Sequence, residues 1–311
     1  MLTFTYHPDY SYDFPDDHRF PMSKFRRLHD NLAGKGILDR VRLVAPEKAS
    51  IDDLCRVHSR DYVTAIAEGS LDKRALRALR LPWSAHLAHR SFIAANGTLL
   101  TARNALQYGL ACHMAGGTHH AHAAGGAGFC VFNDMAYTAC TLLDSGEVER
   151  VLILDTDVHQ GDGTARMLAD QPGTFTCSLH CAQNYPHPKA QSDLDVPIQA
   201  GTDDDGYLDV LSSTLDRLLL TFAPDLVIYD AGADVHIDDA LGKLSLSSAG
   251  MRERDRLVFE RCHDAGAAVA SVIGGGYDLD REALVERHAI PFEVAFEIAS
   301  KLGLRLEKTV A

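Results

Sequence analysis

The sequence lacks several features that would place the protein in a special class. No stretch approaches the roughly 18 uninterrupted apolar residues of a membrane-spanning helix, and the first residues, MLTFTYHPDYSYDF, have neither the basic nor the apolar region of a signal peptide. The seven cysteines include no CxxC pair, and an odd number in 311 residues does not indicate a disulfide framework. We therefore expect a cytoplasmic protein with reduced thiols and no membrane span.

Positive charge is also scarce. The chain has 30 Lys and Arg residues against 43 Asp and Glu residues, which gives a formal net charge of −13. Direct nucleic-acid binding needs a basic surface, so this balance argues against it, while it is compatible with a cationic substrate. No linker rich in Pro, Gly or Ser and no internal repeat divides the chain. We expect a single domain that covers residues 1–311.

Short apolar runs alternate with longer segments of helical periodicity. The runs that predict strands are VRLVA (41–45), GLACHMAGG (109–117), VLILDTDVH (151–159), TFTCSLH (174–180), DLVIYDAGAD (225–234) and AAVASVIGGG (267–276). Between them, residues 50–69 and 207–222 have the apolar spacing of amphipathic helices. This alternation predicts an α/β fold with a largely parallel central sheet and helices on both faces.

Almost all the unusual polar residues follow one of these predicted strands. They are Asp155 and Asp157 after one strand, Asp234 after another, Tyr277 after a third, and the pair His119 and His120 after a fourth. In open α/β sheets, ligands bind outside the carboxyl ends of the strands. The topology therefore predicts that these side chains converge on one site.

The stretch VLILDTDVHQGDG places three carboxylates and an imidazole beyond a strand that should be buried. Alternation along the strand puts Asp157 and His159 on one side, and Asp234 in YDAGAD is the best candidate for a third ligand. Two carboxylates and one imidazole leave an open position for water, as a catalytic divalent cation requires. The alternative is that the aspartates cap a helix beginning near Thr164 or pair with arginines.

The glycine-rich stretch GGTHHAHAAGGAGFCVFND supplies a pair of adjacent histidines. His119 and His120 beside an activated water would suit acid–base catalysis, because imidazole titrates near neutral pH. Each ring needs an acceptor on its other nitrogen, and Asp155 and Asp162 remain for this role. The competing interpretation is a second metal bound by His119 or His120. We regard His122 as incidental.

Tyr277 follows three glycines in SVIGGGYD. A phenol on a flexible glycine loop can donate a hydrogen bond to a developing oxyanion. The alternative is a turn tyrosine that covers the core.

Taken together, these motifs resemble those of the histone deacetylase family, and most closely its bacterial and class IV-like branch. The matching stretches, in family order, are HRFPM, GGTHHAHAAGGAGFCVFND, DTDVHQGDG, TCSLH, DAGADVHIDDALGKLSLS and GGGYD, and they span roughly residues 6–280. The resemblance implies an arginase/deacetylase-type three-layer fold. It also implies hydrolysis of N-acyl-lysine, acetyl or longer, in proteins or peptides.

The resemblance assigns a role to each residue of the expected site. It implies that Asp157, His159 and Asp234 bind Zn²⁺, and such a ligand set also tolerates Fe²⁺. It implies that His119 and His120 are the acid–base pair, oriented by Asp155 and Asp162 respectively. Tyr277 would polarise the amide carbonyl.

The resemblance also implies substrate-binding residues and a second ion. The substrate-binding residues are Gly128, Phe129, Tyr185, Gly275 and Arg19. Of these, Phe129 and Tyr185 would line a narrow tunnel, and Arg19 would lie near an internal cavity for the released acid. A structural K⁺ would be held by Asp155, Asp157, His159, Ser178 and Leu179.

Three features depart from the pattern of class I members. Gln160 stands where many of them have a second histidine, and Asp278 stands where asparagine is common. Residues 70–90 do not resemble the rim loop that holds the substrate backbone. The rival functions are hydrolysis of an acetylpolyamine or another small acylated amine, an arginase-type reaction at two metals, and non-catalytic binding of acyl-lysine.

Overall fold

The structure, a computed structural model, describes residues 1–15 and 17–301. Its centre is a sheet of eight strands in the order β2-β1-β3-β8-β7-β4-β5-β6, in which every neighbouring pair of described strands is parallel. The strands are β1 (Thr3–Thr5), β2 (Arg42–Val44), β3 (Leu110–His113), β4 (Val151–Asp155), β5 (Thr174–Cys181), β6 (Leu194–Ile198), β7 (Leu226–Asp230) and β8 (Ala268–Val272).

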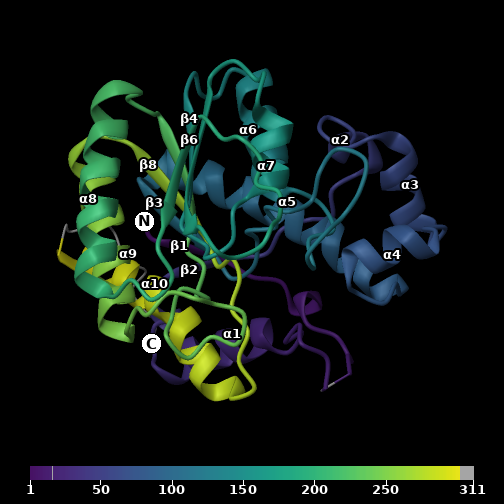
Figure 1. Ribbon diagram of the computed structural model, residues 1–311, viewed down its shortest axis with the longest axis horizontal. Coiled ribbons are helices and arrows are strands. Elements are labelled where there is room, and N and C mark those ends of the chain that lie inside the picture. The colour runs from purple at the N-terminus through teal and green to yellow at the C-terminus, as the bar shows by residue number, and fades with distance from the viewer. Residues whose placement is uncertain (16, 302–311) are drawn as a thin grey trace.

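Helices cover both faces of this sheet. They are α1 (Lys24–Gly34), α2 (Ile51–Leu54), α3 (Arg60–Glu68), α4 (Lys73–Leu79), α5 (Ala85–Tyr108), α6 (Asp134–Asp144), α7 (Asp162–Leu168), α8 (Asp204–Thr221), α9 (Ser248–Asp264) and α10 (Arg281–Lys301), with short 3-10 helices η1 (Pro8–Tyr10) and η2 (Leu38–Arg40). One face carries α5, α6 and α7, and the other carries α1, α8, α9 and α10 (Figure 1). The predicted three-layer α/β fold is therefore confirmed.

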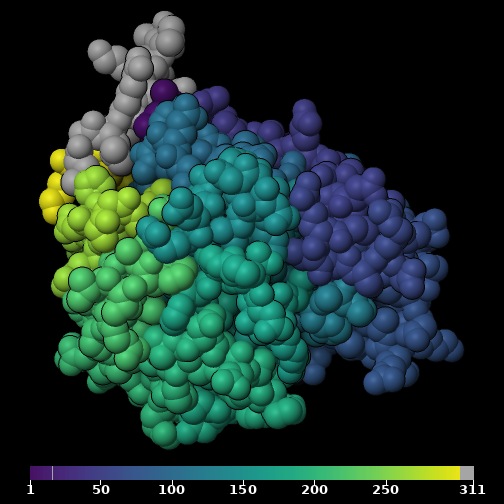
Figure 2. All heavy atoms as spheres, turned by 90° about the horizontal axis from the view of Figure 1, so that it is seen from above, coloured from purple at the N-terminus to yellow at the C-terminus, as the bar shows by residue number. Residues whose placement is uncertain are grey.

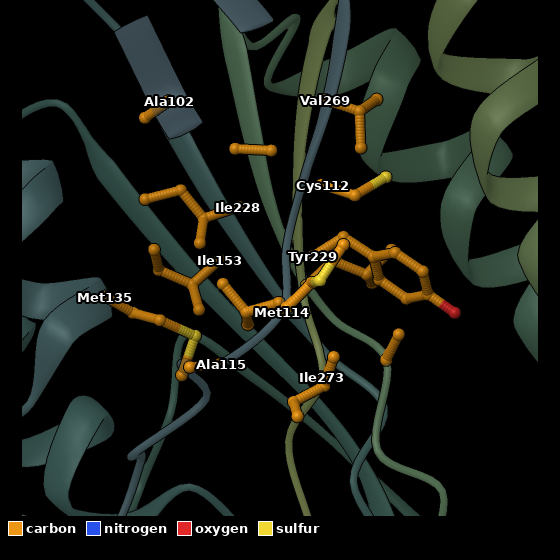
Figure 3. Packing of buried hydrophobic residues seen from close by; sticks show 14 of the residues in the cluster. Ala102, Cys112, Met114, Ala115, Met135, Ile153, Ile228, Tyr229, Val269 and Ile273 are labelled. Carbon is orange, nitrogen blue, oxygen red and sulfur yellow. The ribbon is translucent and has the colours of Figure 1, made fainter. Parts of the chain in front are cut away.

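The central strands are buried on both faces. In the register of β4 with β7, Ile153 lies opposite Ile228, and both side chains are fully covered. Figure 3 shows these two residues close to Met135 of α6, while Tyr229 points to the other side of the sheet. Strands covered on both faces consist of continuous apolar runs, which explains the composition of VLIL in β4.

The sequence analysis missed two strands, β1 and β6. β1 contains only the three residues TFT, which is too short for a periodic pattern. β6 has the sequence LDVPI and forms one edge of the sheet, where Pro197 is tolerated because its missing N–H is not needed by an outer neighbour.

The predicted helical segment 50–69 is divided into α2 and α3. Ser59 caps the second helix by accepting a hydrogen bond from the backbone N–H of Tyr62. Together with α4, these helices form a lobe at one side of the molecule (Figures 1 and 2). Among the described residues, no helix is both long enough and apolar enough to cross a membrane.

Candidate active site

The register of the sheet aligns polar residues at its carboxyl edge. Asp155, the last residue of β4, lies opposite Asp230 in β7 and opposite Ser178 in β5. Directly beyond β4, the chain carries Asp157 and His159, and all five residues are buried. Side chains from three neighbouring strands therefore meet at this edge, as the topology predicts.

Asp157, His159 and Asp234 form a compact buried group. Nδ1 of His159 lies 3.0 Å from Oδ1 of Asp157 and 3.2 Å from Oδ2 of Asp234. Among the described residues, neither carboxylate forms an ion pair with a lysine or arginine, so the alternative of arginine pairing does not hold for them. The loop after β7 approaches the loop after β4 so closely that a Cβ at Gly232 would lie only 2.7 Å from Cα of Asp157. Glycine at this position permits the close approach.

Backbone groups orient the two carboxylates of this group. Gly275 N–H donates to Oδ2 of Asp157 over 2.7 Å, and Val158 N–H donates to Oδ1 of Asp234 over 2.9 Å. Oδ2 of Asp234 is buried and has no hydrogen-bond partner within the described part of the chain. An orphaned buried carboxylate oxygen facing an imidazole nitrogen indicates a cation-binding site.

The electrostatics of the group point to the same conclusion. Burial and the nearby charge of Asp157 raise the pKa of Asp234 to about 7, because two carboxylates this close repel each other. A divalent cation would remove this repulsion. Two ligand atoms that each lie about 2.0–2.1 Å from a tetrahedral Zn²⁺ are about 3.3 Å from each other. The distances of 3.0 Å and 3.2 Å from Nδ1 of His159 to the two carboxylate oxygens are close to this value. The residues therefore fit a catalytic divalent cation.

The adjacent histidines each have their own carboxylate. Nδ1 of His119 is 2.9 Å from Oδ2 of Asp155, and Nδ1 of His120 is 2.9 Å from Oδ1 of Asp162. The two Nε2 atoms lie 3.1 Å from each other. Asp162 also pairs with Arg166 and begins α7, so the interpretation as a helix-starting, arginine-paired residue holds for this aspartate.

The environments of the two imidazoles push their pKa values apart. Burial lowers the pKa of His119, but the carboxylates of Asp155 and Asp157 more than reverse this and raise it well above its usual value. Burial and the charge of His119 lower the pKa of His120 to about 3. A pair of this kind offers one protonated and one neutral imidazole, which is the arrangement needed for combined acid and base catalysis.

Tyr277 lines the same cavity as Asp157 and follows a glycine loop that packs on the cation group, the name used below for Asp157, His159 and Asp234. A Cβ at Gly275 would lie 2.5 Å from Oδ2 of Asp157 and closer still to Oδ2 of Asp234, so only glycine fits there. Tyr277 N–H donates to Oδ2 of Asp239 over 2.6 Å. Burial and the nearby carboxylates raise the pKa of the Tyr277 phenol well above its usual value, so the phenol is a hydrogen-bond donor.

Aromatic side chains surround the approach to this group. The ring centroid of Phe129 is 5.6 Å from that of Tyr277, and the ring centroid of Tyr185 is 4.8 Å from that of His120. A Cβ at Gly128 would lie 2.7 Å from Cδ2 of His120. The cavity lined by His120, Gly128, Phe129 and Tyr277 encloses about 670 Å³, part of it open to solvent. Its lining combines aromatic side chains with polar groups that include His119 and Asp157.

Comparison with known proteins places this site in a family. Residues 18–290 match the profile of the histone deacetylase domain. The chain is 47% identical over 293 residues to an uncharacterised protein of Picosynechococcus sp., covering 94% of this chain and 98% of that protein. It is also 30% identical to Histone deacetylase 2 of Arabidopsis thaliana, over 84% of this chain and 70% of the plant protein.

The chain belongs to the histone deacetylase family. A solved histone deacetylase homologue in complex with SAHA superposes with a TM-score of 0.80 at 25% identity, covering 94% of this chain and 84% of that one. Membership of the family supports deacetylase activity.

One residue that the resemblance assigned to the site lies elsewhere. Arg19 is exposed and lines an outer groove with Leu279, whereas the cations inside the cavity are Lys24 and Arg90. Arg19 therefore does not line the cavity, and its predicted role near the released acid stays a prediction. Lys24 is the first residue of α1, and its spacing of four residues from buried Leu28 puts it on the inward face of that helix.

Lys24 and Asp230 are residues of the site that the sequence analysis missed. Burial lowers the pKa of Lys24 to about 8, and its Nζ donates to the carbonyl of Gly274 over 3.3 Å. Both carboxylate oxygens of Asp230 are buried without a hydrogen-bond partner among the described residues. With His119 and Asp155, Asp230 forms a second group of potential metal ligands. The sequence signal for Asp230 is the carboxylate that ends the apolar run DLVIYD, in register with Asp155 at the end of β4.

The structure gives reasons for two of the three departures from the class I pattern. Nε2 of Gln160 donates to Oδ1 of Asp195 over 2.7 Å, and its side chain is buried beside β6. Asp278 accepts a hydrogen bond from Nη1 of buried Arg287 over 2.7 Å, which fixes the loop directly after Tyr277.

Proposed function

We propose that the protein is a metal-dependent deacylase that hydrolyses the amide bond of N-acyl-lysine, acetyl or longer, in proteins or peptides. One observation carries this proposal. Asp157, the two carboxylate-paired histidines and Tyr277 all line one cavity whose walls also carry aromatic side chains. Apolar walls beside hydrolytic groups suit a long aliphatic side chain that ends in an amide.

Asp157, His159 and Asp234 would hold the catalytic cation, Zn²⁺ or alternatively Fe²⁺. When bound, the cation would supply a Lewis acid that acidifies water and polarises the amide carbonyl. Backbone N–H groups hold one oxygen of each carboxylate, which leaves Oδ1 of Asp157 and Oδ2 of Asp234 beside Nδ1 of His159.

The protein side chains move the protons of the reaction. Neutral His120 takes the proton of the attacking water at Nε2 while the C–O bond forms, and Asp162 stabilises the resulting imidazolium through Nδ1. Tyr277 donates its phenolic hydrogen bond to the oxyanion. As the C–N bond breaks, protonated His119 gives its proton to the leaving amine, and the products are the deacylated lysine side chain and a carboxylic acid. Transfer of the proton from His120 to His119 between their Nε2 atoms, 3.1 Å apart, restores the starting pair.

The proposed substrate contacts use the walls of the cavity. Gly128, Phe129 and Tyr185 would contact the methylene stem of the acyl-lysine, and Gly275 would lie beside the amide. A structural K⁺ would lie behind the site, bound by Asp155, Asp157, His159, Ser178 and Leu179, where β4 and β5 pair. The proposed partner is an acyl-lysine protein or peptide.

A substrate panel tests this function. Metal-stripped and Zn²⁺-restored protein would be assayed with acetyl-, octanoyl- and myristoyl-lysine peptides and with N-acetylputrescine. We expect Zn²⁺-dependent release of the acid from at least one acyl-lysine peptide. Tyr277→Phe removes one donor to the oxyanion, so kcat should fall about 10²–10³-fold while metal content stays unchanged.

Other outcomes of this panel would support rival functions. Turnover of N-acetylputrescine alone would replace the protein substrate by a small acylated amine. Tight binding of acyl-lysine peptides without any turnover, in protein that contains the cation, would favour non-catalytic recognition.

A further inference from the structure

Helix α4 presents a basic face to solvent. Lys73 and Arg77 are four residues apart, which places them on one side of the helix, and Arg74 lies next to them. Arg80 follows directly after α4 as its C-cap residue, in the left-handed conformation. All four side chains are exposed, whereas Leu79 on the opposite side is fully buried. The sequence KRALRALR therefore builds a cationic strip, referred to below as the α4 basic face and consisting of Lys73, Arg74, Arg77 and Arg80.

The charges of the α4 basic face are not neutralised by neighbouring carboxylates. Within residues 1–15 and 17–301, none of its four members forms an ion pair, whereas surface cations on α9, including Arg252, Arg256 and Arg261, each pair with an Asp or Glu. The nearby carboxylate of Asp72 is occupied, since it caps α4 through the N–H of Ala75. In a chain of net charge −13, this is a local reversal of sign.

The α4 basic face begins beside a residue of the cavity wall. The carbonyl of Leu79 accepts the N–H of Phe129 over 3.0 Å, so the end of α4 is fastened to one cavity wall. Burial raises the pKa of Tyr185, and Arg80 lies near enough to oppose this shift. From Leu79 back to Lys73 the helix rises about 9 Å, which equals about three residues of an extended peptide.

We propose that the α4 basic face binds an acidic segment of the protein substrate, within about three to six residues of the acyl-lysine in the cavity. This inference rests on the proposed function and specifies its substrate class. A polyamine would be repelled by these cations, and a nucleic acid would be repelled by the acidic remainder of the molecule. An extended peptide with Asp or Glu at this spacing satisfies both constraints.

Matched peptides test the proposal. One fluorescent acetyl-lysine peptide carries a run of glutamates that starts about three residues from the acyl-lysine, and its match carries glutamines instead. Each peptide is made in two versions, with the glutamates or glutamines before the acyl-lysine in one and after it in the other. In at least one order we expect the acidic peptide to have a KM about tenfold lower than its match, with kcat unchanged, and we expect about 0.5 M salt to remove the difference.

A triple variant with Lys73→Gln, Arg74→Gln and Arg77→Gln should lose this preference. It should still hydrolyse an acetyl-lysine amide without flanking residues at the wild-type rate, because Arg80 and the cavity wall are left unchanged. The matched control on α9, with Arg252, Arg256 and Arg261 each changed to Gln, should retain the preference. Equal KM values for the two wild-type peptides, or a preference that survives in the α4 variant, would overturn the proposal.

Fluorescence anisotropy with the same peptides separates this inference from the proposed function. If no acyl-lysine is hydrolysed, the proposed function fails, while tighter binding of the acidic peptide that is lost in the α4 variant still supports the basic face as an acidic-peptide site. A labelled single-stranded oligonucleotide serves as competitor. If it binds more tightly than the acidic peptide, and only when the α4 basic face is intact, the assignment to a protein substrate is wrong.

Discussion

The Gly275→Ala variant would disturb the cation group with a single added methyl. The new Cβ would lie 2.5 Å from Oδ2 of Asp157 and closer still to Oδ2 of Asp234, where contacts below 3.0 Å force a shift. Each carboxylate would have to retreat by about 0.5 Å or more, whereas metal–ligand distances tolerate about 0.2 Å. We expect the affinity for Zn²⁺ to fall at least about 100-fold, with activity falling in parallel.

Metal titration of the stripped protein measures this effect. Gly275 does not occupy the left-handed region, so alanine introduces a clash without backbone strain. The control is Gly34→Ala at the end of α1, where a Cβ would have no atom within 4 Å and metal affinity should not change. Near-native Zn²⁺ affinity in folded Gly275→Ala protein would refute the close packing of the glycine loop on the two carboxylates.

Two further substitutions test contacts that support the site. Arg287 is buried and pairs with Asp278 over 2.7 Å, so Arg287→Gln should lower the free energy of unfolding by about 2–4 kcal/mol in denaturant titrations. The exposed control Arg261→Gln should change it by about 1 kcal/mol or less, and similar losses in both variants would contradict the buried ion pair. Asp162→Asn deprives His120 of its carboxylate partner, so kcat should fall about 10²–10⁴-fold with little change in KM. A loss of only a few-fold in steady-state kinetics would count against the orienting role.

Residues that belong to a strand end or a glycine turn could be placed from the sequence. Asp157, His159 and Asp234 follow buried apolar runs, and the carboxyl ends of parallel strands meet at one edge. The same topology brings His119, in the loop after β3, towards Asp155 at the end of β4, whereas the specific pairing of the two residues was implied by the family resemblance. The structure brings these groups together at hydrogen-bonding distances, while their chemical roles remain predictions.

Residues whose position depends on helix orientation could not be placed in this way. Arg19 and Lys24 are both cations near the start of the chain, and only the direction of α1 decides that Lys24 faces the cavity. The sequence pattern places Asp230 within an apolar strand, although its two buried oxygens without hydrogen-bond partners make it part of the site. The strands β1 and β6 escaped notice because one is very short and the other is a polar edge.

The number of cations needed for activity tests the central claim most directly. Metal-stripped protein would be titrated with Zn²⁺ while hydrolysis of an acetyl-lysine peptide is followed. We expect activity to rise linearly and to saturate at one equivalent of Zn²⁺ per chain, and we expect Asp234→Asn to abolish this high-affinity response. Undiminished activity in the stripped protein would contradict a single catalytic cation at Asp157, His159 and Asp234. A requirement for two equivalents of Zn²⁺, with the second equivalent no longer bound in Asp230→Asn, would also contradict it.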